Sequence, residues 1–278
     1  MNKIKFFDPH IHINPDLYFR KYDLFTLGEE LKKVDSCAVL KSHLCSTIIQ
    51  AKLAQRLGYK IYGSIVLNRC SGGVDIETVK SAIVANENNQ MLIYMPTLLN
   101  SQMKIKTDET IHPILNNLSY EDEIGESVSR QHEISEILTI ASNYNIPIAT
   151  GHMTKKDTEF IVNLAIKKGT KVILTHPLHK MIGLSIKELR DITNSKNIFM
   201  ELTILMYVLE QQKEENIREV FNNINYKKII VSSDLGQVRN CSVTKGYELY
   251  FNVLSRFLSQ EMVESVIYRN MMDIFKTN

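Results

Sequence analysis

Histidines are the residues of this sequence whose type and spacing point most directly to chemistry. There are eight of them: His10, His12, His43, His112, His132, His152, His176 and His179. The imidazole ring is the commonest metal ligand in proteins and can move a proton near neutral pH. His10 and His12 stand two residues apart in a short apolar run. On a β-strand both would point to the same face and could share one cation.

The elements that must position these histidines follow from the apolar pattern. Short runs rich in β-branched residues alternate with longer amphipathic stretches along the whole chain. The predicted strands are 4–12, 37–43, 61–68, 91–99, 146–152, 171–176, 198–205 and 228–234. The predicted helices are 24–34, 47–57, 75–86, 129–144, 155–168, 185–193, 211–223 and 245–258, with one more over 260–275. This order predicts a single-domain α/β protein, a (β/α)8 TIM barrel spanning 1–278, with a doubly wound open sheet as the alternative.

One connection in this pattern is unusually long. Residues 100–128, after the fourth predicted strand, are mostly polar, whereas most such connections need only a handful of residues. We predict that this segment is a lid-like insertion over one end of the barrel. The tail over 260–275 is predicted as an extra C-terminal helix.

The barrel would bring distant residues together. In a TIM barrel the carboxyl ends of all strands meet at one pocket. His10, His12, His152, His176 and Asp234 all fall at predicted strand ends. A cluster of imidazoles with a carboxylate suits zinc or a similar divalent ion. Taken singly, each histidine could instead be a hydrogen-bonded structural residue, and Asp234 could cap the following turn.

Composition limits the partners. The chain has 33 Lys plus Arg against 31 Asp plus Glu, a formal charge of +2, so it lacks the basic field that nucleic-acid binding requires. The first residues leave no room for an apolar signal segment, and no apolar run approaches a membrane span. Four cysteines without a CxxC pair favour reduced thiols. We therefore expect a cytoplasmic protein with a small-molecule substrate, no nucleic-acid or membrane partner, and an oligomeric state that leaves a homo-oligomer open.

Several short motifs together resemble a known superfamily. They are Asp8-Pro-His10-Ile-His12, Gly151-His152, Thr175-His176-Pro177, Ser232-Ser233-Asp234 and the tail that begins at Asn270. The whole chain is similar to the amidohydrolase superfamily, specifically its phosphotriesterase-like, metal-dependent TIM-barrel hydrolases. The run Val39-Leu-Lys41-Ser-His43, with Asn68-Arg69 and Gly72-Gly73 further on, resembles a poorly characterised branch of that superfamily.

The resemblance implies roles for the clustered residues. His10 and His12 would bind one metal ion, and His152 and His176 a second. Asp234 would bind the first ion and accept a proton from the nucleophilic water. The implied activity is that of a metal-dependent hydrolase, whose metal-bound hydroxide attacks an amide, lactone or phosphoester bond.

The sequence departs from the family pattern at the metal bridge. Binuclear members carry a carboxylated lysine or a glutamate on the fourth strand, but 91–99 holds no Lys, Glu or Asp. Lys41 on the second strand is the first replacement, because a buried, neutral lysine could react with CO2 to form a carbamate. It could equally be a cation paired with Asp8 or with a substrate anion. Glu201 on the seventh strand is the second candidate, and its alternative is a hydrogen-bonding structural carboxylate.

The remaining candidates would contact the substrate. His43 shares the inward face with Lys41 and could be a ligand, a general acid or an oxyanion donor; we expect it to face the substrate. The candidate rim residues are Arg69, Gly72, Gly73, Arg20, Gln237 and Arg239, which could bind a phosphate or carboxylate. We expect His112 and His132 to be solvated and His179 to support a loop.

Two other functions stay open. A mononuclear site on the same scaffold could act as a deaminase or a nonoxidative decarboxylase. The deaminases of the superfamily carry a glutamate shortly after the fifth-strand histidine, and the run Gly151-His152-Met-Thr-Lys-Lys lacks it. The less favoured possibility is a noncatalytic barrel that keeps its pocket for ligand binding.

Overall fold

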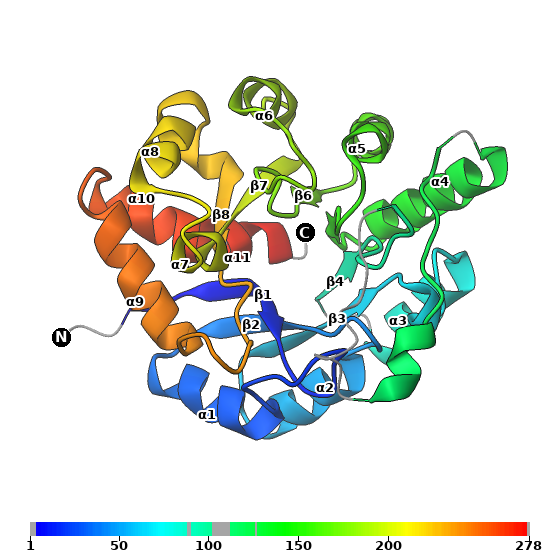
Figure 1. Ribbon diagram of the computed structural model, residues 1–278, viewed down its shortest axis with the longest axis horizontal. Coiled ribbons are helices and arrows are strands. Elements are labelled where there is room, and N and C mark those ends of the chain that lie inside the picture. Colours follow the sequence, from blue (N-terminus) through cyan, green and yellow to red (C-terminus); the bar gives the residue numbers. More distant parts are fainter. Residues whose placement is uncertain (1–3, 88–89, 102–111, 126, 277–278) are drawn as a thin grey trace.

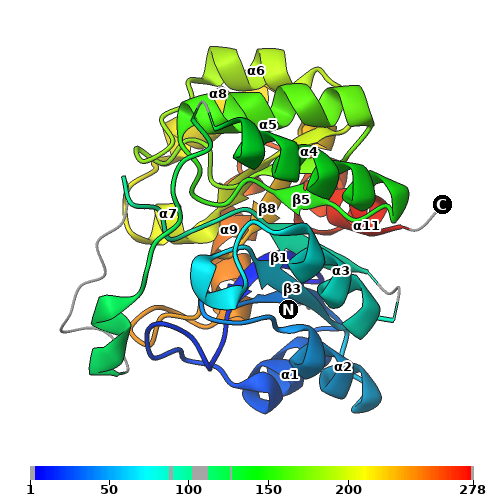
Figure 2. The ribbon, with the colours of Figure 1, turned by 90° about the vertical axis from the view of Figure 1, so that its right-hand side faces the viewer.

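The computed structural model describes residues 4–87, 90–101, 112–125 and 127–276, and Figures 1 and 2 show its helices arranged outside its strands. The strands are β1 (Phe7–His12), β2 (Cys37–Lys41), β3 (Ile61–Val66), β4 (Met91–Tyr94), β5 (Ile148–Ala149), β6 (Val172–Leu174), β7 (Ile198–Thr203) and β8 (Ile229–Ser232). The α-helices are α1 (Leu24–Lys33), α2 (Ile48–Arg56), α3 (Ile76–Ala85), α4 (Val128–Asn143), α5 (Lys155–Lys168), α6 (Ile186–Thr193), α7 (Ile204–Val208), α8 (Glu214–Asn223), α9 (Val243–Leu254), α10 (Gln260–Glu264) and α11 (Asn270–Phe275). A π-helical turn, η5 (Ser265–Arg269), joins the last two.

The strands form one parallel sheet in the order β1 to β8. The sheet closes on itself because Ile11 pairs with Leu235, just after β8. The His12 amide donates to the Leu235 carbonyl at 2.9 Å, and the Asp234 amide donates to the His10 carbonyl at 2.8 Å. The predicted (β/α)8 barrel is therefore confirmed, with β1 and β8 adjacent at its seam.

Local sequence explains where several helices begin and end. Asp23 caps α1, and Ser185 caps α6 with a reciprocal bond from Glu188, so free backbone N–H groups of the first turn are satisfied. Gly169 ends α5 in the left-handed conformation that glycine adopts without strain. These caps explain why the helix boundaries could be predicted to within a few residues.

One end of the barrel is closed by packing. Phe7 and Cys37, the first residues of β1 and β2, belong to a buried cluster that also holds Met271, Ile274 and Phe275 of α11. The rings of Phe7 and Phe275 meet edge to face with centroids 5.2 Å apart. The tail of the chain therefore seals the amino-terminal end, and the opposite end is the one that carries polar residues.

The strands end earlier than the sequence predicts. Lys41 ends β2, so His43 lies in the following loop, and His152, His176 and Asp234 likewise follow their strands. His176 (φ 27°) and Asp234 (φ 52°) have left-handed backbones, which cannot continue a strand. Residues 204–208 form α7, where the sequence had predicted the end of a strand. The predicted C-terminal helix is also divided in three by the π-helical turn.

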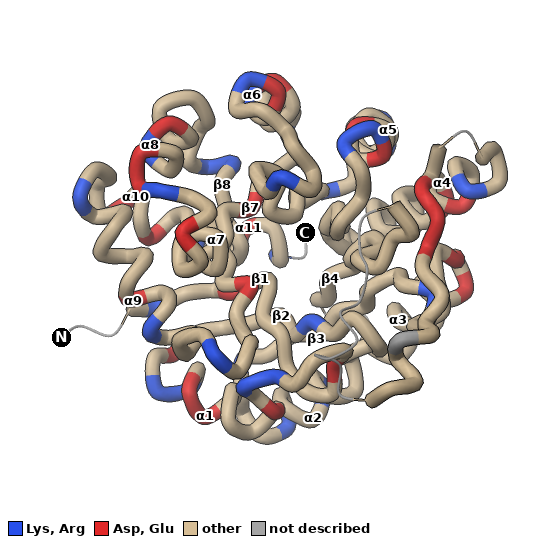
Figure 3. The backbone as a smooth tube through the Cα atoms, in the orientation of Figure 1, with Lys and Arg blue, Asp and Glu red and all other residues tan. Residues whose placement is uncertain are grey.

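The predicted insertion at 100–128 is only partly open to description, because 102–111 and 126 lie outside the described residues. Its described parts include a short 3-10 helix, η3 (Pro113–Asn117), and a bridge between Leu99 and Glu121. Within the described residues, none of the helices combines the length and the apolar character that a membrane crossing requires. Figure 3 shows acidic and basic residues interspersed over the outer helices.

Candidate metal centre

Five histidines form a closed ring at the carboxyl end of the barrel. They come from the ends of four strands, β1, β2, β5 and β6, or the loops that follow them. Successive ring centroids are 5.2 Å apart for His10 and His12, 4.9 Å for His12 and His43, and 6.2 Å for His43 and His152. The circle is completed by His152 and His176 at 5.1 Å, and by His176 and His10 at 6.1 Å. The structure thus brings together imidazoles that lie more than 160 positions apart.

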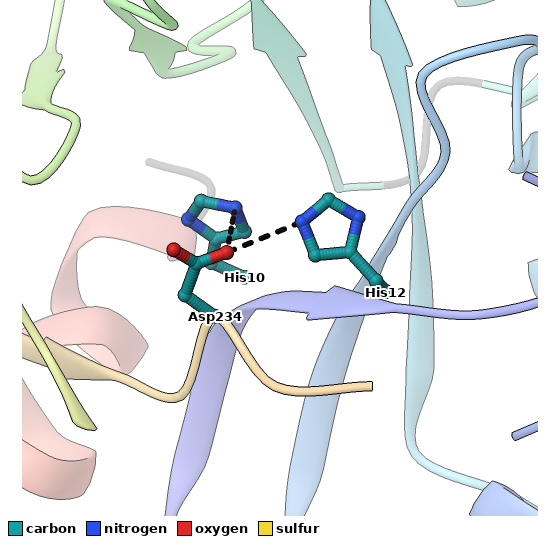
Figure 4. Close-up of side chains that lie close together, drawn as sticks. All are labelled: His10, His12 and Asp234. Atoms are coloured by element: carbon teal, nitrogen blue, oxygen red, sulfur yellow. Dashed lines mark hydrogen bonds and ion pairs between the residues drawn. The ribbon is translucent and has the colours of Figure 1, made fainter. Parts of the chain in front are cut away.

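Asp234 reaches into this ring and meets two of its members, as Figure 4 shows. Its Oδ1 atom lies 3.2 Å from Nε2 of His10 and 3.2 Å from Nε2 of His12. The Asp234 side chain is 17% exposed, whereas those of His10 and His12 are nearly buried. These three residues form a group whose ligand atoms are close enough to hold one metal ion.

The hydrogen bonds of the Nδ1 atoms of His10 and His12 show which nitrogen of each ring is left to face a cation. Nδ1 of His10 lies 2.9 Å from Oε1 of Glu201, which can only accept a hydrogen bond while ionised. Nδ1 of His12 lies 3.2 Å from Oδ2 of Asp16. With a proton on Nδ1 and none on Nε2 in each ring, both Nε2 atoms present lone pairs to Oδ1 of Asp234.

Three converging acceptors repel one another unless a positive charge lies close to all of them, and among the described hydrogen bonds the Lys41 amine reaches only Nε2 of His10. A carboxylate behind a metal-bound histidine is also the usual second layer of metal sites. Arg20 lies equally close to Nδ1 of His12, at 3.2 Å, but its Nη2 atom is nearer to Asp16, at 2.6 Å. The donor set therefore fits a divalent metal ion.

His152 and His176 supply a second pair of nitrogens. Nδ1 of His152 lies 2.9 Å from the Thr97 carbonyl oxygen. Nδ1 of His176 is buried and has no hydrogen-bond partner among the described residues, which is costly for a polar atom. Burial lowers the pKa of His152 well below its ordinary value and lowers that of His176 to about 4. Both rings are therefore neutral at pH 7, the form that can bind a metal.

Lys41 is fully buried beside the first pair. Its Nζ atom lies 2.8 Å from Nε2 of His10 and 4.5 Å from the centre of the Tyr94 ring. Burial is the main influence on this amine and lowers its pKa to about 8. No ion pair joins Lys41 to Asp8, so the predicted alternative of an Asp8 partner is not what the structure shows. The amine instead lies next to the metal-facing nitrogen of His10.

Glu201 is engaged on both oxygens. Oε1 accepts from His10, and Oε2 accepts from the backbone N–H of His176 at 2.8 Å. This arrangement favours the hydrogen-bonding alternative for Glu201 over the metal-bridging one. Glu201 fixes the orientation of the His10 ring and the position of the His176 backbone, and both histidines are candidate metal ligands.

Replacing Glu201 with glutamine tests this role. The amide can still accept one hydrogen bond, but its NH2 group faces a donor, so we expect zinc affinity to fall about 10- to 100-fold. Isothermal titration with zinc measures the change, and Glu136→Gln on the exposed face of α4 is the matched control. Unchanged zinc affinity in the Glu201 variant would argue against the role.

The backbone around the site is strained. His176 and Asp234 have positive φ angles, which few non-glycine residues adopt. Gly236 has a φ of 124°, and a Cβ atom there would lie 2.1 Å from the His12 carbonyl oxygen. The β1–β8 seam therefore needs glycine at this position.

We expect Gly236→Ala to lower the free energy of unfolding by about 3 kcal/mol or more, because strain and a backbone clash coincide. Gly58→Ala is the control, since Gly58 also has a positive φ but no atom within 4 Å of its Cβ position. Its loss should be about 1 kcal/mol. Urea denaturation of both variants measures the difference, and equal losses would contradict the account.

A cavity of about 600 Å³ opens in front of the ring. It is lined by His12, His43, His152, Asp234, Tyr18, Phe19, Arg20, Gln237, Val238 and Arg239. Three of the predicted substrate residues, Arg20, Gln237 and Arg239, are therefore at the site, and the backbones of Arg20 and Gln237 pair across the β1–β8 seam. Arg69, Gly72 and Gly73 line a different cavity, of about 400 Å³, with Glu121 and Arg130. The structure does not bring these three to the histidines.

The other histidines also have defined places. His132 is exposed on α4, and His112 caps η3 and is exposed. The ring of His179 lies 5.6 Å from that of His176, at the edge of the site. His179 thus lies nearer to the five clustered histidines than we expect for a residue that only supports a loop.

Sequence reasoning missed three polar residues that hold the site. Asp16 is fully buried, binds Arg20 and His12, and accepts the His43 amide at 2.7 Å. Thr97 and Asn68, also fully buried, hydrogen-bond to His43 and to each other. A usable signal was present for Asp16, which follows His12 by four residues, and for Thr97, a polar residue at the end of a strand that lacks charged groups.

Comparison with known proteins places the fold among metal-dependent barrel structures. An amidohydrolase from Burkholderia multivorans with bound Zn aligns at a TM-score of 0.60 and 8% identity, over 98% of this chain and 99% of that one. A probable 2-pyrone-4,6-dicarboxylic acid hydrolase from Acinetobacter baumannii with citric acid bound aligns at 0.60 and 10%, over 99% of each chain. A dihydroxybenzoic acid decarboxylase from Polaromonas sp. JS666, with bound manganese and an inhibitor, aligns at 0.55 and 10%, over 99% and 97%. The chain has the fold of the amidohydrolase superfamily.

The sequence itself matches one family. Residues 5–201 match the family of unknown function DUF6282, so the chain belongs to that family. Among curated proteins, none matches the sequence significantly. The resemblance to a poorly characterised branch of the amidohydrolase fold is thereby confirmed.

Proposed function

We propose that this protein is a metal-dependent hydrolase that acts on an amide, lactone or phosphoester bond of a small molecule. The observation that carries the proposal is the convergence of His10, His12 and Asp234: Oδ1 of Asp234 lies 3.2 Å from Nε2 of His10 and 3.2 Å from Nε2 of His12. Such an arrangement at the open end of a barrel is stable with a divalent cation and costly without one.

His10, His12 and Asp234 would hold the first metal ion, with zinc as the leading choice for nitrogen and oxygen ligands. His152 and His176 would hold a second ion in a binuclear form. When bound, the metal supplies a water of lowered pKa and polarises the substrate oxygen. Lys41, if carboxylated, would provide the bridging ligand that β4 lacks.

The chain's own groups would then orient and protonate the substrate. Asp234 reaches the cavity and can receive a proton and pass it to the leaving group. Arg20 and Gln237 line the same cavity, with Arg239 at its exposed edge. Their donors suit a carboxylate or phosphate on the substrate. Tyr18 and Phe19 offer an apolar wall for the rest of the molecule.

A mononuclear decarboxylase is the second candidate. The observation that favours it is that Glu201 is not free to bridge two ions, because both of its oxygens are bound to protein donors, and that β4 holds no acidic residue. Without a carbamate on Lys41, the second ion would lack a bridge. One ion held by His10, His12 and Asp234 would then remain.

Metal analysis and an activity panel separate these candidates. Protein purified with added zinc is measured for metal content and then tested on amide, ester, lactone and phosphotriester substrates and for CO2 release from aromatic acids. About two ions and hydrolysis support the binuclear hydrolase, whereas one ion and CO2 release support the decarboxylase. Metal-loaded protein that is inactive on the whole panel would contradict both. A metal-free, inactive protein would favour a noncatalytic barrel.

A further inference from the structure

Thr97 lies three residues after β4, between two of the ring histidines, and contacts each with a different atom. Its hydroxyl oxygen lies 2.7 Å from Nδ1 of His43. Its carbonyl oxygen lies 2.9 Å from Nδ1 of His152. Thr97 and His43 are buried, and His43 also lines the cavity. One residue thus controls the protonated nitrogen of two neighbouring imidazoles.

The contact between the Thr97 carbonyl oxygen and Nδ1 allows only one tautomer of His152. A carbonyl oxygen only accepts hydrogen bonds, so Nδ1 of His152 must carry the proton. In the neutral ring Nε2 is then left with its lone pair. This tautomer is the one that binds a metal through Nε2.

Asn68 determines which atom donates in the hydrogen bond between the Thr97 hydroxyl and Nδ1 of His43. Oδ1 of Asn68 accepts the backbone N–H groups of Thr97 at 2.7 Å and Leu98 at 3.0 Å, which fixes the orientation of its amide. Nδ2 of Asn68 therefore faces Thr97 and donates to its hydroxyl oxygen at 2.9 Å. The hydroxyl hydrogen of Thr97 then has Nδ1 of His43 as its acceptor.

If instead Nδ1 of His43 donated, the Thr97 hydroxyl hydrogen would have no acceptor among the described residues, which is costly in a buried site. The neutral His43 ring therefore carries its proton on Nε2. Among the described residues Nε2 of His43 has no hydrogen-bond partner. The donor is thus left for a ligand in the cavity.

We infer that Thr97 holds His43 and His152 in opposite tautomers, so that His43 presents an N–H donor for an acceptor oxygen of the substrate, and His152 presents a lone pair. The substrate part of this inference rests on the proposed function. The acceptor would be a carbonyl or phosphoryl oxygen on which negative charge develops. His43 is thereby a substrate-binding group, and Thr97 and Asn68 are positioning residues.

The inference separates His43 from the metal ligands. His12, Asp16 and His43 lie close enough together to be considered a second cation group. However, both oxygens of Asp16 already accept hydrogen bonds, from Leu17 and His43 on one side and from Arg20 on the other. With a proton on Nε2 and the Thr97 hydroxyl on Nδ1, neutral His43 has no lone pair to offer.

Nitrogen NMR of the histidine side chains tests the tautomers without any substrate. In metal-free protein with 15N-labelled histidine we expect the Nε2–H form for His43 and the Nδ1–H form for His152. Thr97→Val removes the hydroxyl but keeps the carbonyl and the branched shape, so His43 should lose its preference and His152 should not. Thr97→Ser should restore His43.

The same tautomer for both rings in the wild-type protein would overturn the inference, whether or not the valine variant folds. A preference of His43 that survives in a folded Thr97→Val variant would also overturn it. Because these spectra need no metal or activity, they stand even where zinc uptake fails. Failure of the proposed function can therefore be distinguished from failure of this inference.

Inorganic phosphate tests the donor role in zinc-loaded protein. His43→Phe keeps an aromatic ring but removes both nitrogens, so we expect zinc content to be unchanged and phosphate affinity to fall about tenfold. Unchanged phosphate affinity would overturn the donor role, and loss of a zinc ion would show that His43 is a ligand.

Discussion

Replacing His10 with alanine is expected to remove the metal and the activity together. His10 provides one of three converging acceptors, and its Nδ1 is held by Glu201, so no neighbouring group can replace it without moving. We expect zinc affinity to fall by at least about 100-fold and hydrolysis to fall below detection. Elemental analysis of the purified variant, together with its rate on the best substrate of the panel, measures both effects.

The control for this prediction is His132→Ala. His132 lies on α4 with a side chain that is 71% exposed, and it belongs to no metal group in the described part of the chain. It should keep wild-type zinc content and rate. A His10 variant that retains both zinc and activity would refute the assigned role.

Replacing Asp234 with asparagine is expected to separate chemistry from metal binding. Asparagine keeps the shape and one oxygen ligand but removes the negative charge and the proton acceptor. We expect the turnover number to fall about 100- to 10,000-fold, with a smaller loss of zinc. Single-turnover kinetics on zinc-saturated protein measures the chemical step directly.

Asp273→Asn is the matched control, because Asp273 is exposed on α11 and pairs only with Lys276 among the described ion pairs. Its turnover number should equal that of the wild type. Should zinc-saturated Asp234→Asn turn over at the wild-type rate, another group must accept the proton, and the proposed role of Asp234 would fail.

The barrel could be predicted from the sequence because the pattern of apolar and polar residues in each strand–helix unit indicates its secondary structure. Apolar strands such as 61–66 alternate with capped amphipathic helices such as α5, and the order of units leaves few topologies. The strand ends could not be placed as well. Whether the backbone at His176 or Asp234 turns to positive φ depends on the contacts those residues make across the barrel, which local sequence does not encode.

The candidate metal ligands could be predicted from the sequence better than the residues that hold them in place. His10, His12, His152, His176 and Asp234 are recognisable because their type is rare and their position in the strand order repeats. Asp16, Asn68 and Thr97 are common residue types, and only three-dimensional contacts show which of many such residues lie behind a histidine.

Two candidates for the metal bridge could be distinguished only with coordinates. From sequence, Lys41 and Glu201 are both single charged residues on otherwise apolar strands. In the structure Glu201 is tied to His10 and to the His176 backbone, whereas the Lys41 amine lies beside the metal-facing nitrogen of His10. Under the proposed function, Lys41 is therefore better placed than Glu201 to supply the bridging ligand, as a carbamate.

Anomalous diffraction at the zinc edge, from crystals grown with zinc, tests the central assignment most directly. We predict a peak within bonding distance of Nε2 of His10, Nε2 of His12 and a carboxylate oxygen of Asp234. Zinc-loaded crystals in which that position shows no anomalous peak, with the three side chains still converging, would contradict it.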